Sequence, residues 1–303
     1  MPESAPGIGE LLSHFSWDLP WIAGLALVAW LYLRAFRRLS RSNPRIPHPA
    51  WKAASFISGI VVVAAAVLSP LEHWGNQLLW ANFTGFLAIT MLAPPLLLLG
   101  SPLTLAFRVS NPQGRGRLRQ FYRGRVMAAL TFPVVSWLLF AVATYLWQFT
   151  TLTDDAAANV FIRDAQQLSL LAVGLLFWMP ALCTDPVRWR IPYPLRALYV
   201  FVEMTHKGLF GGMFLSMASA IHPGFAVGLP AWGPSAMTDQ RMAILILWIG
   251  GNLIFLVALI GIIVRWVRYE SRATARTDLQ LEKARAAKRR HRAAIESVFH
   301  RPV

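Results

Sequence analysis

The feature that most constrains this sequence is a series of long apolar runs separated by arginine-rich segments. A helix that crosses the hydrocarbon core of a membrane needs roughly 20 predominantly apolar residues. Seven runs of suitable length lie at Leu19–Phe36, Ala53–Leu71, Leu78–Leu99, Met127–Phe149, Gln166–Cys183, Leu195–Ile221 and Met242–Trp266. Only 14% of the 303 residues are charged, against roughly a quarter in a soluble domain. The sequence therefore predicts an all-α integral membrane protein, a bundle of seven transmembrane helices.

The basic residues predict how these helices are oriented. All but three of the 29 Lys and Arg residues lie in the first, third and fifth connecting segments or in the C-terminal tail. The exceptions are Arg163, Lys207 and Arg241. Because Lys and Arg accumulate in cytoplasmic loops, this alternation predicts an N-terminus outside and a C-terminus in the cytoplasm.

The same pattern divides the chain into three parts. Residues 1–18 form a short extracytoplasmic N-terminus, residues 19–268 the membrane domain, and residues 269–303 a basic cytoplasmic tail that we expect to be helical. The connecting segment Ser110–Arg125 is expected to be a turn-rich loop, and both it and the tail suit anionic lipid headgroups. The net charge of +15 does not indicate a nucleic-acid partner, because the basic residues are placed between apolar runs.

The clearest set of ionisable residues inside the runs lies within the sixth run, where charge is costly. Spacings of three and four place Glu203, His206 and Lys207 on one helix face. The interpretation that we favour is an internal ion pair between Glu203 and Lys207, with His206 hydrogen-bonded to a neighbouring helix. The alternative is a relay point for protons or a metal.

Soft metal ligands occur towards the predicted outer side. Met213, Met217 and His222 follow on the sixth run, and His73 lies in the second connecting segment. Thioethers and imidazoles suit copper(I), although methionines at helical spacing more often fill a hydrophobic core. Copper is therefore one candidate cofactor, and no other is indicated. The sequence also lacks a nucleotide-binding glycine loop and a nucleophile elbow, so no enzymatic activity is predicted.

Helix-breaking residues interrupt the third run. Pro94 and Pro95 each remove a backbone donor, and Gly100 and Pro102 follow closely. We expect a kink or an early helix end here, buried against the rest of the protein.

These prolines belong to an ordered set of motifs. The set comprises APPLLLLGSP at Ala93–Pro102, GLLFWMP at Gly174–Pro180 with Trp178 and Pro180, Asp185-Pro186, Trp232-Gly233, Asp239-Gln240 and Trp248–Gly251. In this order they resemble the CtaG-type cytochrome c oxidase assembly proteins, and the likeness covers most of the chain from the second run to the seventh. The resemblance implies a seven-span protein of the bacterial plasma membrane that supports assembly of a haem–copper oxidase, acts in copper delivery and has oxidase subunits as partners.

The resemblance also implies a copper site. The family's expected ligands are two pairs of histidines, each spaced by four residues, before the APP run and before the LFW run. Here the first pair of positions holds Asn82 and Phe86, and the second holds Arg163 and Gln167, with Gln166 at the intervening acidic position. Asn, Gln and Arg are poor copper ligands and Phe is none. We therefore expect the family's scaffold without its usual copper ligands.

Three functional hypotheses follow. The first is an assembly or accessory factor that binds an oxidase subunit. The second is a membrane copper(I) carrier or transporter that uses the helix face of Met213, Met217 and His222. The third is a permanent structural subunit of a respiratory complex.

Overall fold

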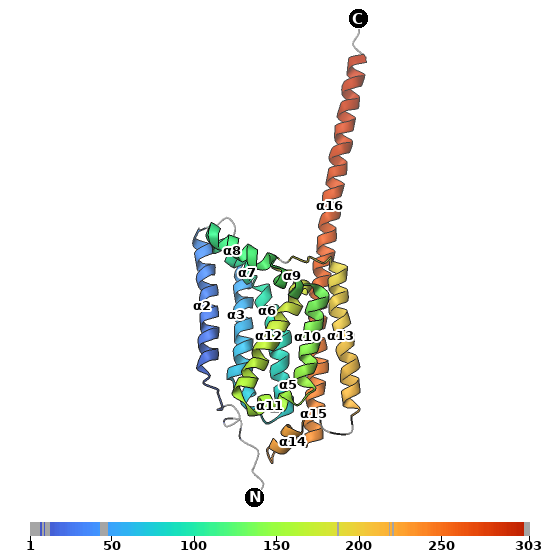
Figure 1. Cartoon of the computed structure of the whole chain (residues 1–303). Coiled ribbons are helices and arrows are strands. Elements are labelled where there is room, and N and C mark those ends of the chain that lie inside the picture. The colour runs from blue at the N-terminus through green and yellow to red at the C-terminus, as the bar shows by residue number, and fades with distance from the viewer. Residues whose placement is uncertain are drawn as a thin grey trace.

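The computed structural model describes residues 13–42, 48–186, 188–217, 219 and 221–299, together with residues 7 and 9; side chains are described up to residue 288. Within these residues the secondary structure is helical, with no strand. Most of the long helices stand side by side as a bundle, and the last helix projects far beyond one end of it (Figure 1).

The helices differ widely in length. The long ones are α2 (Leu19–Ser42), α3 (Ala50–Leu68), α10 (Pro133–Gln148), α12 (Val160–Leu182), α13 (Tyr193–Leu215) and α16 (Gly251–Phe299). The shorter ones are α4 (Pro70–Gly75), α5 (Leu79–Leu87), α6 (Ala93–Leu99), α7 (Pro102–Val109), α8 (Pro112–Arg123), α9 (Arg125–Leu130), α11 (Leu152–Ala158), α14 (Pro223–Gly228) and α15 (Ala236–Leu245), with π-helices η1 (Ala88–Leu92) and η2 (Ile246–Gly250).

Five helical stretches in the described residues are long and apolar enough to cross a membrane. They are Leu19–Arg41, Ala50–Leu68, Leu79–Val109, Val160–Leu182 and Ala236–Lys288. The pair α10 and α11, bent by 65°, gives a sixth if it is counted as one span. The chain is thus a multi-pass membrane protein. The predicted sixth span, on α13, is not in this set, since its charged residues lower its hydropathy.

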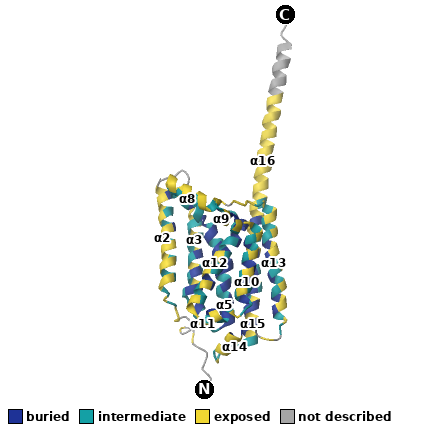
Figure 2. Cartoon of the chain, viewed as in Figure 1, coloured by how far each residue is buried: buried dark blue, intermediate teal, exposed yellow. Residues whose placement is uncertain are grey.

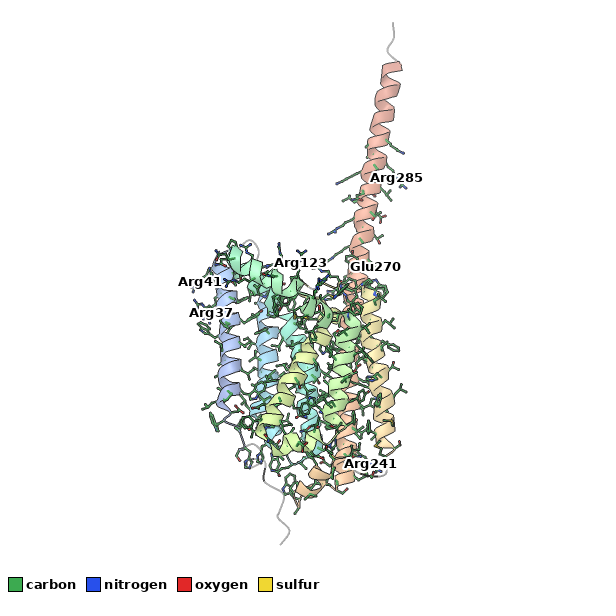
Figure 3. All side chains as sticks on the ribbon, in the orientation of Figure 1. Arg37, Arg41, Arg123, Arg241, Glu270 and Arg285 are labelled. Carbon is green, nitrogen blue, oxygen red and sulfur yellow. The ribbon has the colours of Figure 1, made fainter. Side chains whose placement is uncertain are left out.

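The charged residues are distributed unequally between the two ends of the bundle. Figure 3 shows Arg37, Arg41 and Arg123 at one end, with Arg285 beyond it on α16, whereas Arg241 lies at the other end. We call these the basic end and the opposite end. The helix α2 begins at the opposite end, and α16 leaves the bundle at the basic end (Figure 1).

The core lies at the centre of the bundle, where buried residues concentrate (Figure 2). Phe177 and Trp178 of α12 are fully buried and pack against Phe140 of α10 and Phe255 of α16. Aromatic pairs of this kind add to the energy gained from burial. By contrast, much of α2 is exposed along its length, as expected for a helix at the edge of a membrane bundle.

The two prolines of the third run interrupt the α-helical hydrogen bonding, but the helix continues past them, and the structure shows how this is accommodated. In an α-helix the carbonyl of Thr90 would accept from the amide of residue 94, but Pro94 has no N–H. The chain forms the π-helix η1 here, and Trp178 Nε1 donates to Thr90 O at 3.3 Å. Gly174 permits this contact, because a Cβ there would lie 2.8 Å from the same oxygen.

Two buried aspartates cap helices that are distant in sequence. Asp239 of α15 accepts from the amides of Leu79 and Trp80 at 2.7 and 3.1 Å, at the start of α5. Asp185, in the segment after α12, accepts from the amides of Leu103 and Thr104 at 3.2 and 2.8 Å, at the start of α7. Helix N-termini carry unpaired donors and partial positive charge, so both carboxylates join separate parts of the fold.

The helices depart from the predicted segments at several places. The expected turn-rich segment Ser110–Arg125 contains the helix α8, because Pro112 suits a first helical turn and Asn111 accepts from the Gly114 amide at 2.8 Å. The sixth run ends as helix at Leu215, not at Ile221. The seventh run begins at Ala236, and α16 continues without a break past residue 268.

We predict that Asp239→Ala lowers the free energy of unfolding by about 2–3 kcal/mol, because two buried amides lose a charged acceptor. Unfolding of the purified protein in mixed micelles measures the change. Asp155→Ala, at an exposed position on α11, is the matched control and should change it by less than about 0.5 kcal/mol. Equal effects of the two substitutions would contradict the capping role of Asp239.

Candidate functional site at the opposite end of the bundle

A small polar pocket lies at the opposite end, between α4, α5, α10, α11 and α12. Its volume is about 40 Å³. The side chains of Asn82 and Phe86 line it from α5, and those of Arg163 and Gln167 line it from α12. The structure therefore brings all four positions of the expected histidine pairs together around one pocket.

Two of the residues that line this pocket form an ion pair. Arg163 Nε lies 2.8 Å from Glu72 Oε1 of α4, and the Glu72 side chain is buried. The hydroxyl of Ser16 donates to the other carboxylate oxygen of Glu72. The Ser16 amide also donates to Leu68 O at 3.1 Å, which holds the segment before α2 against this end of the bundle.

Amide side chains complete the lining. Asn82 Nδ2 donates to Gly75 O at 3.1 Å and so links α5 to the end of α4. Gln166 and Gln167 are buried beside Arg163. Gln148 is fully buried, and neither atom of its amide has a hydrogen-bond partner within the described part of the chain. A polar cavity of this volume can hold ordered water, which would satisfy such an amide.

The chemistry of the pocket does not suit copper. Its four central positions carry two carboxamides, a phenyl ring and a guanidinium, none of which is a good ligand for copper. The guanidinium of Arg163 also places a positive charge where a metal ion would bring another. Among the described residues, no group of three His, Cys, Asp or Glu side chains could hold a metal ion.

A comparison with known protein families identifies the scaffold. The model of the cytochrome c oxidase caa3 assembly factor family (Caa3_CtaG) matches residues 30–269. The chain belongs to this family. The pocket lies within the matched region, so it is part of the caa3 assembly factor scaffold and not an addition to it.

Curated relatives of this member of the caa3 assembly factor family occur in mycobacteria. The chain is 27% identical over 285 residues to the uncharacterized protein Mb0105 of Mycobacterium bovis and to the uncharacterized protein MT0111 of Mycobacterium tuberculosis, covering 90% of this chain and 42% of each relative. It is also 27% identical to the uncharacterized protein ML1998 of Mycobacterium leprae, covering 82% of this chain and 38% of the relative. The chain thus spans about two fifths of these relatives' length. No solved structure matches it.

The motifs behind the family resemblance lie at packing contacts. A Cβ at Gly100 would lie 2.6 Å from Phe56 Cβ, so only glycine allows α3 to approach this closely. Ser101 adopts the left-handed conformation (φ 51°) just before Pro102 begins α7. Gln240 Oε1 accepts from the Ile221 amide at 2.7 Å and thereby ties α15 to the segment before α14. These residues shape the scaffold that holds the pocket.

The ionisable residues of α13 form a second polar site. Glu203 is almost fully buried, with its carboxylate oxygens 3.6 Å from Lys207 Nζ and 3.3 Å from His206 Nδ1. The other ring nitrogen of His206 lies 2.6 Å from the hydroxyl of Tyr145 on α10. The Lys207 ammonium also lies over the Phe140 ring at 5.2 Å. The charges are thus matched within the bundle.

The structure places the candidate soft ligands in different surroundings. His222 is buried, with its ring nitrogens 3.0 Å from Gln148 O and 3.5 Å from the Asp154 carboxylate, facing α10 and α11. Met213 is 46% exposed on α13, and Met217 is partly exposed just beyond the end of α13. Because α13 ends at Leu215, Met217 and His222 lie beyond it, and the predicted common helix face of Met213, Met217 and His222 is wrong.

His73 belongs to the end of the bundle that carries the pocket, one residue after Glu72. Its ring stacks on that of His14, with 4.2 Å between the centroids. Burial, and to a smaller extent the neighbouring His14, lowers the pKa of His73. The neutral form of the His73 ring is therefore favoured, which suits its stacking on His14.

Sequence reasoning missed two residues of the pocket, Glu72 and Gln148. Each lies on a different helix from the histidine positions, so no spacing along the chain connects them. One available signal was that Arg163 is among only three basic residues outside the predicted cytoplasmic segments. A basic residue at the edge of the membrane region, away from the cytoplasmic segments, is expected to pair with an acid. In the folded chain that acid is Glu72.

We predict that Arg163→Gln lowers the free energy of unfolding by about 2–4 kcal/mol, because it leaves the buried Glu72 carboxylate without its counter-charge. The double variant Glu72→Gln with Arg163→Gln should be more stable than Arg163→Gln alone, which a double-mutant cycle in mixed micelles measures. Arg241→Gln, at an exposed position at the same end, is the control. Additive effects of the two pocket substitutions would contradict the coupling.

Proposed function

We propose that this chain is an assembly or accessory factor of a haem–copper cytochrome oxidase, embedded in the bacterial plasma membrane, that acts by binding an oxidase subunit and not by holding copper at the family's histidine positions. The observation that carries the proposal is the convergence of those four positions on one pocket that contains the Arg163–Glu72 ion pair. Membership of the caa3 assembly factor family supports the assembly role.

The proposal includes a topology of seven membrane crossings with the pocket on the outer face. The seventh crossing is assigned to helix α13, although its charged residues keep it out of the set of apolar stretches. This helix has 23 residues and packs along α16 in the bundle (Figure 1). Its buried charges are matched by each other, which reduces the cost of placing them in the membrane. The concentration of arginine at the basic end supports a cytoplasmic location for that end.

In this topology the Arg163–Glu72 ion pair supports binding of the oxidase subunit by holding the docking surface in a fixed shape. It fixes the relative positions of α4 and α12, and Ser16 extends the same network to the segment that precedes α2. A partner that docks on this end therefore meets a surface whose shape is set before binding. Such preorganisation reduces the entropy lost on association.

The role in assembly is tested by deleting the gene and recording reduced-minus-oxidised haem spectra of the membranes. We expect less assembled haem–copper oxidase, restored by the wild-type gene and by Met213→Leu with Met217→Leu, since those methionines are not needed. Added copper should not restore assembly. Normal oxidase levels in the deletion strain would contradict an assembly role, and failure of the methionine variant to complement would favour the copper carrier hypothesis.

The absence of copper ligands is tested by restoring them. We predict that the variant with Asn82→His, Phe86→His, Arg163→His and Gln167→His binds about one copper(I) per chain, because four imidazoles then surround one pocket. Wild type should retain far less than one copper under the same conditions, as measured by metal analysis with a competing chelator. The matched variant that keeps Arg163 should bind more weakly. No gain in the four-histidine variant would contradict the placement of these positions around a common site.

Purification in mild detergent separates an assembly factor from a permanent subunit. We expect oxidase subunits to co-purify at well below one per chain, because assembly factors release their products. A stable partner at constant one-to-one stoichiometry would instead favour the third hypothesis, a structural subunit.

A further inference from the structure

A long apolar groove lies on the side of the bundle, between α6, α12, the start of α13 and α16. Its volume is about 470 Å³, within the range of roughly 300–1,000 Å³ usual for ligand pockets. Trp178 and Ile262 are buried at its base, whereas Leu253 and Val257 are at least 60% exposed along its side. Since α16 belongs to a stretch apolar enough to cross a membrane, the groove faces the hydrocarbon region. We call it the α6–α16 groove.

The groove ends in a cluster of arginines towards the basic end. Arg196 and Arg265 line the groove itself, together with Tyr193. These three residues also line an adjoining cavity of about 640 Å³, which continues along α16 where that helix leaves the bundle. The adjoining cavity adds three more arginines. The resulting arginine cluster is Arg196, Arg265, Arg268, Arg272 and Arg276.

This cluster has no acidic counterpart in the described part of the chain. The four ion pairs found there involve none of its five arginines. The nearest acid along α16, Glu270, accepts instead from Trp266 Nε1 at 2.6 Å. Figure 3 shows Glu270 where α16 emerges from the bundle. Four of these arginines follow one another at spacings of three and four along the exposed face of α16, which leaves a concentration of positive charge that an anion can neutralise.

One arginine of the cluster is already oriented for a ligand. Arg196 Nε donates to Ile191 O at 2.8 Å, and the guanidinium lies over the Tyr193 ring at 4.5 Å. These contacts fix the plane of the guanidinium while using only one of its nitrogens. The two terminal nitrogens form the fork that binds a phosphate in a bidentate manner.

We propose that the α6–α16 groove binds an anionic phospholipid, with an acyl chain along the groove and the phosphate at the arginine cluster. The combination of an apolar channel at membrane depth and unpaired arginines at its end matches the two halves of such a lipid. A transmembrane helix of a partner would fill the apolar part but leave the cluster uncompensated. The site is distinct from the segments Ser110–Arg125 and Leu279–Phe299 that the sequence associates with headgroups, and it does not depend on the proposed oxidase role.

Two variants test the two halves of the site separately. Arg196→Gln with Arg265→Gln removes charge at the headgroup end. Gly261→Phe fills the groove, and because nothing lies within 4 Å of a Cβ at Gly261, the new side chain enters open space and does not strain the packing. Gly24→Phe on α2 is the matched control, since its Cβ also meets open space but lies outside the groove. Arg37→Gln with Arg41→Gln controls for charge at the basic end.

The full-length protein is purified in mild detergent and the bound phospholipid is identified by native mass spectrometry, with size-exclusion profiles to confirm folding. We expect about one anionic phospholipid per wild-type chain, a loss of at least about tenfold in the Arg196/Arg265 variant, since each headgroup contact is worth about fivefold, and a similar loss in Gly261→Phe. Both controls should retain the lipid.

Three outcomes of the lipid measurement would overturn the proposal. They are no retained lipid in wild type, equal retention of zwitterionic lipid, and retention by both test variants at the level of the controls. A further arm adds inorganic phosphate to delipidated protein: binding of phosphate as tight as that of the lipid would also overturn it, because the groove would then contribute nothing. A co-purifying protein lost in Gly261→Phe, in the absence of lipid, would assign the groove to a helix and overturn it as well.

Discussion

Polar groups inside a membrane have no water to bond with, so they have to be satisfied within the chain. This constraint explains most of the specific contacts in the bundle. Glu203 is matched by Lys207 and His206, and Trp178 bonds the carbonyl that Pro94 leaves without its helical partner. Asp239 bonds the first amides of a helix far away in sequence. Each contact joins two different helices or neutralises a charge on one of them, and together they fix the arrangement in which the apolar surfaces can pack.

The same constraint on buried polar groups applies to the pocket at the opposite end of the bundle. A fold that assembles four side chains around one small space can hold a metal or can close the space with groups of its own. In this chain Arg163 and Glu72, which line the space, neutralise each other, and Asn82 donates to the backbone of α4. The scaffold of the caa3 assembly factor family thus carries, in this chain, a pocket whose four positions hold no good copper ligand. The function that we propose follows from this combination, because a preformed surface can recognise an oxidase subunit without a metal.

Much of the fold was predictable because apolar length and arginine placement act locally along the sequence. The helical class, the interruption of α-helical bonding before Pro94 and the separation of basic residues to one end all follow from such local signals. The helix α8 was missed, since its basic composition concealed a good N-cap at Asn111. Family resemblance located the pocket positions but could not supply Glu72 or Gln148, which reach the pocket only through tertiary packing. The α6–α16 groove could not be predicted from the sequence either, because its residues come from several separate helices.

The central claim is that an ion pair, and not a metal, occupies the site where the two helices α5 and α12 meet α4. A cryo-electron microscopy map of the protein in lipid nanodiscs, prepared with excess copper(I), tests it most directly. We predict continuous density between the side chains of Arg163 and Glu72, with no metal density in the pocket. Density for an ion among Asn82, Arg163 and Gln167, with the guanidinium displaced from the carboxylate, would contradict the account.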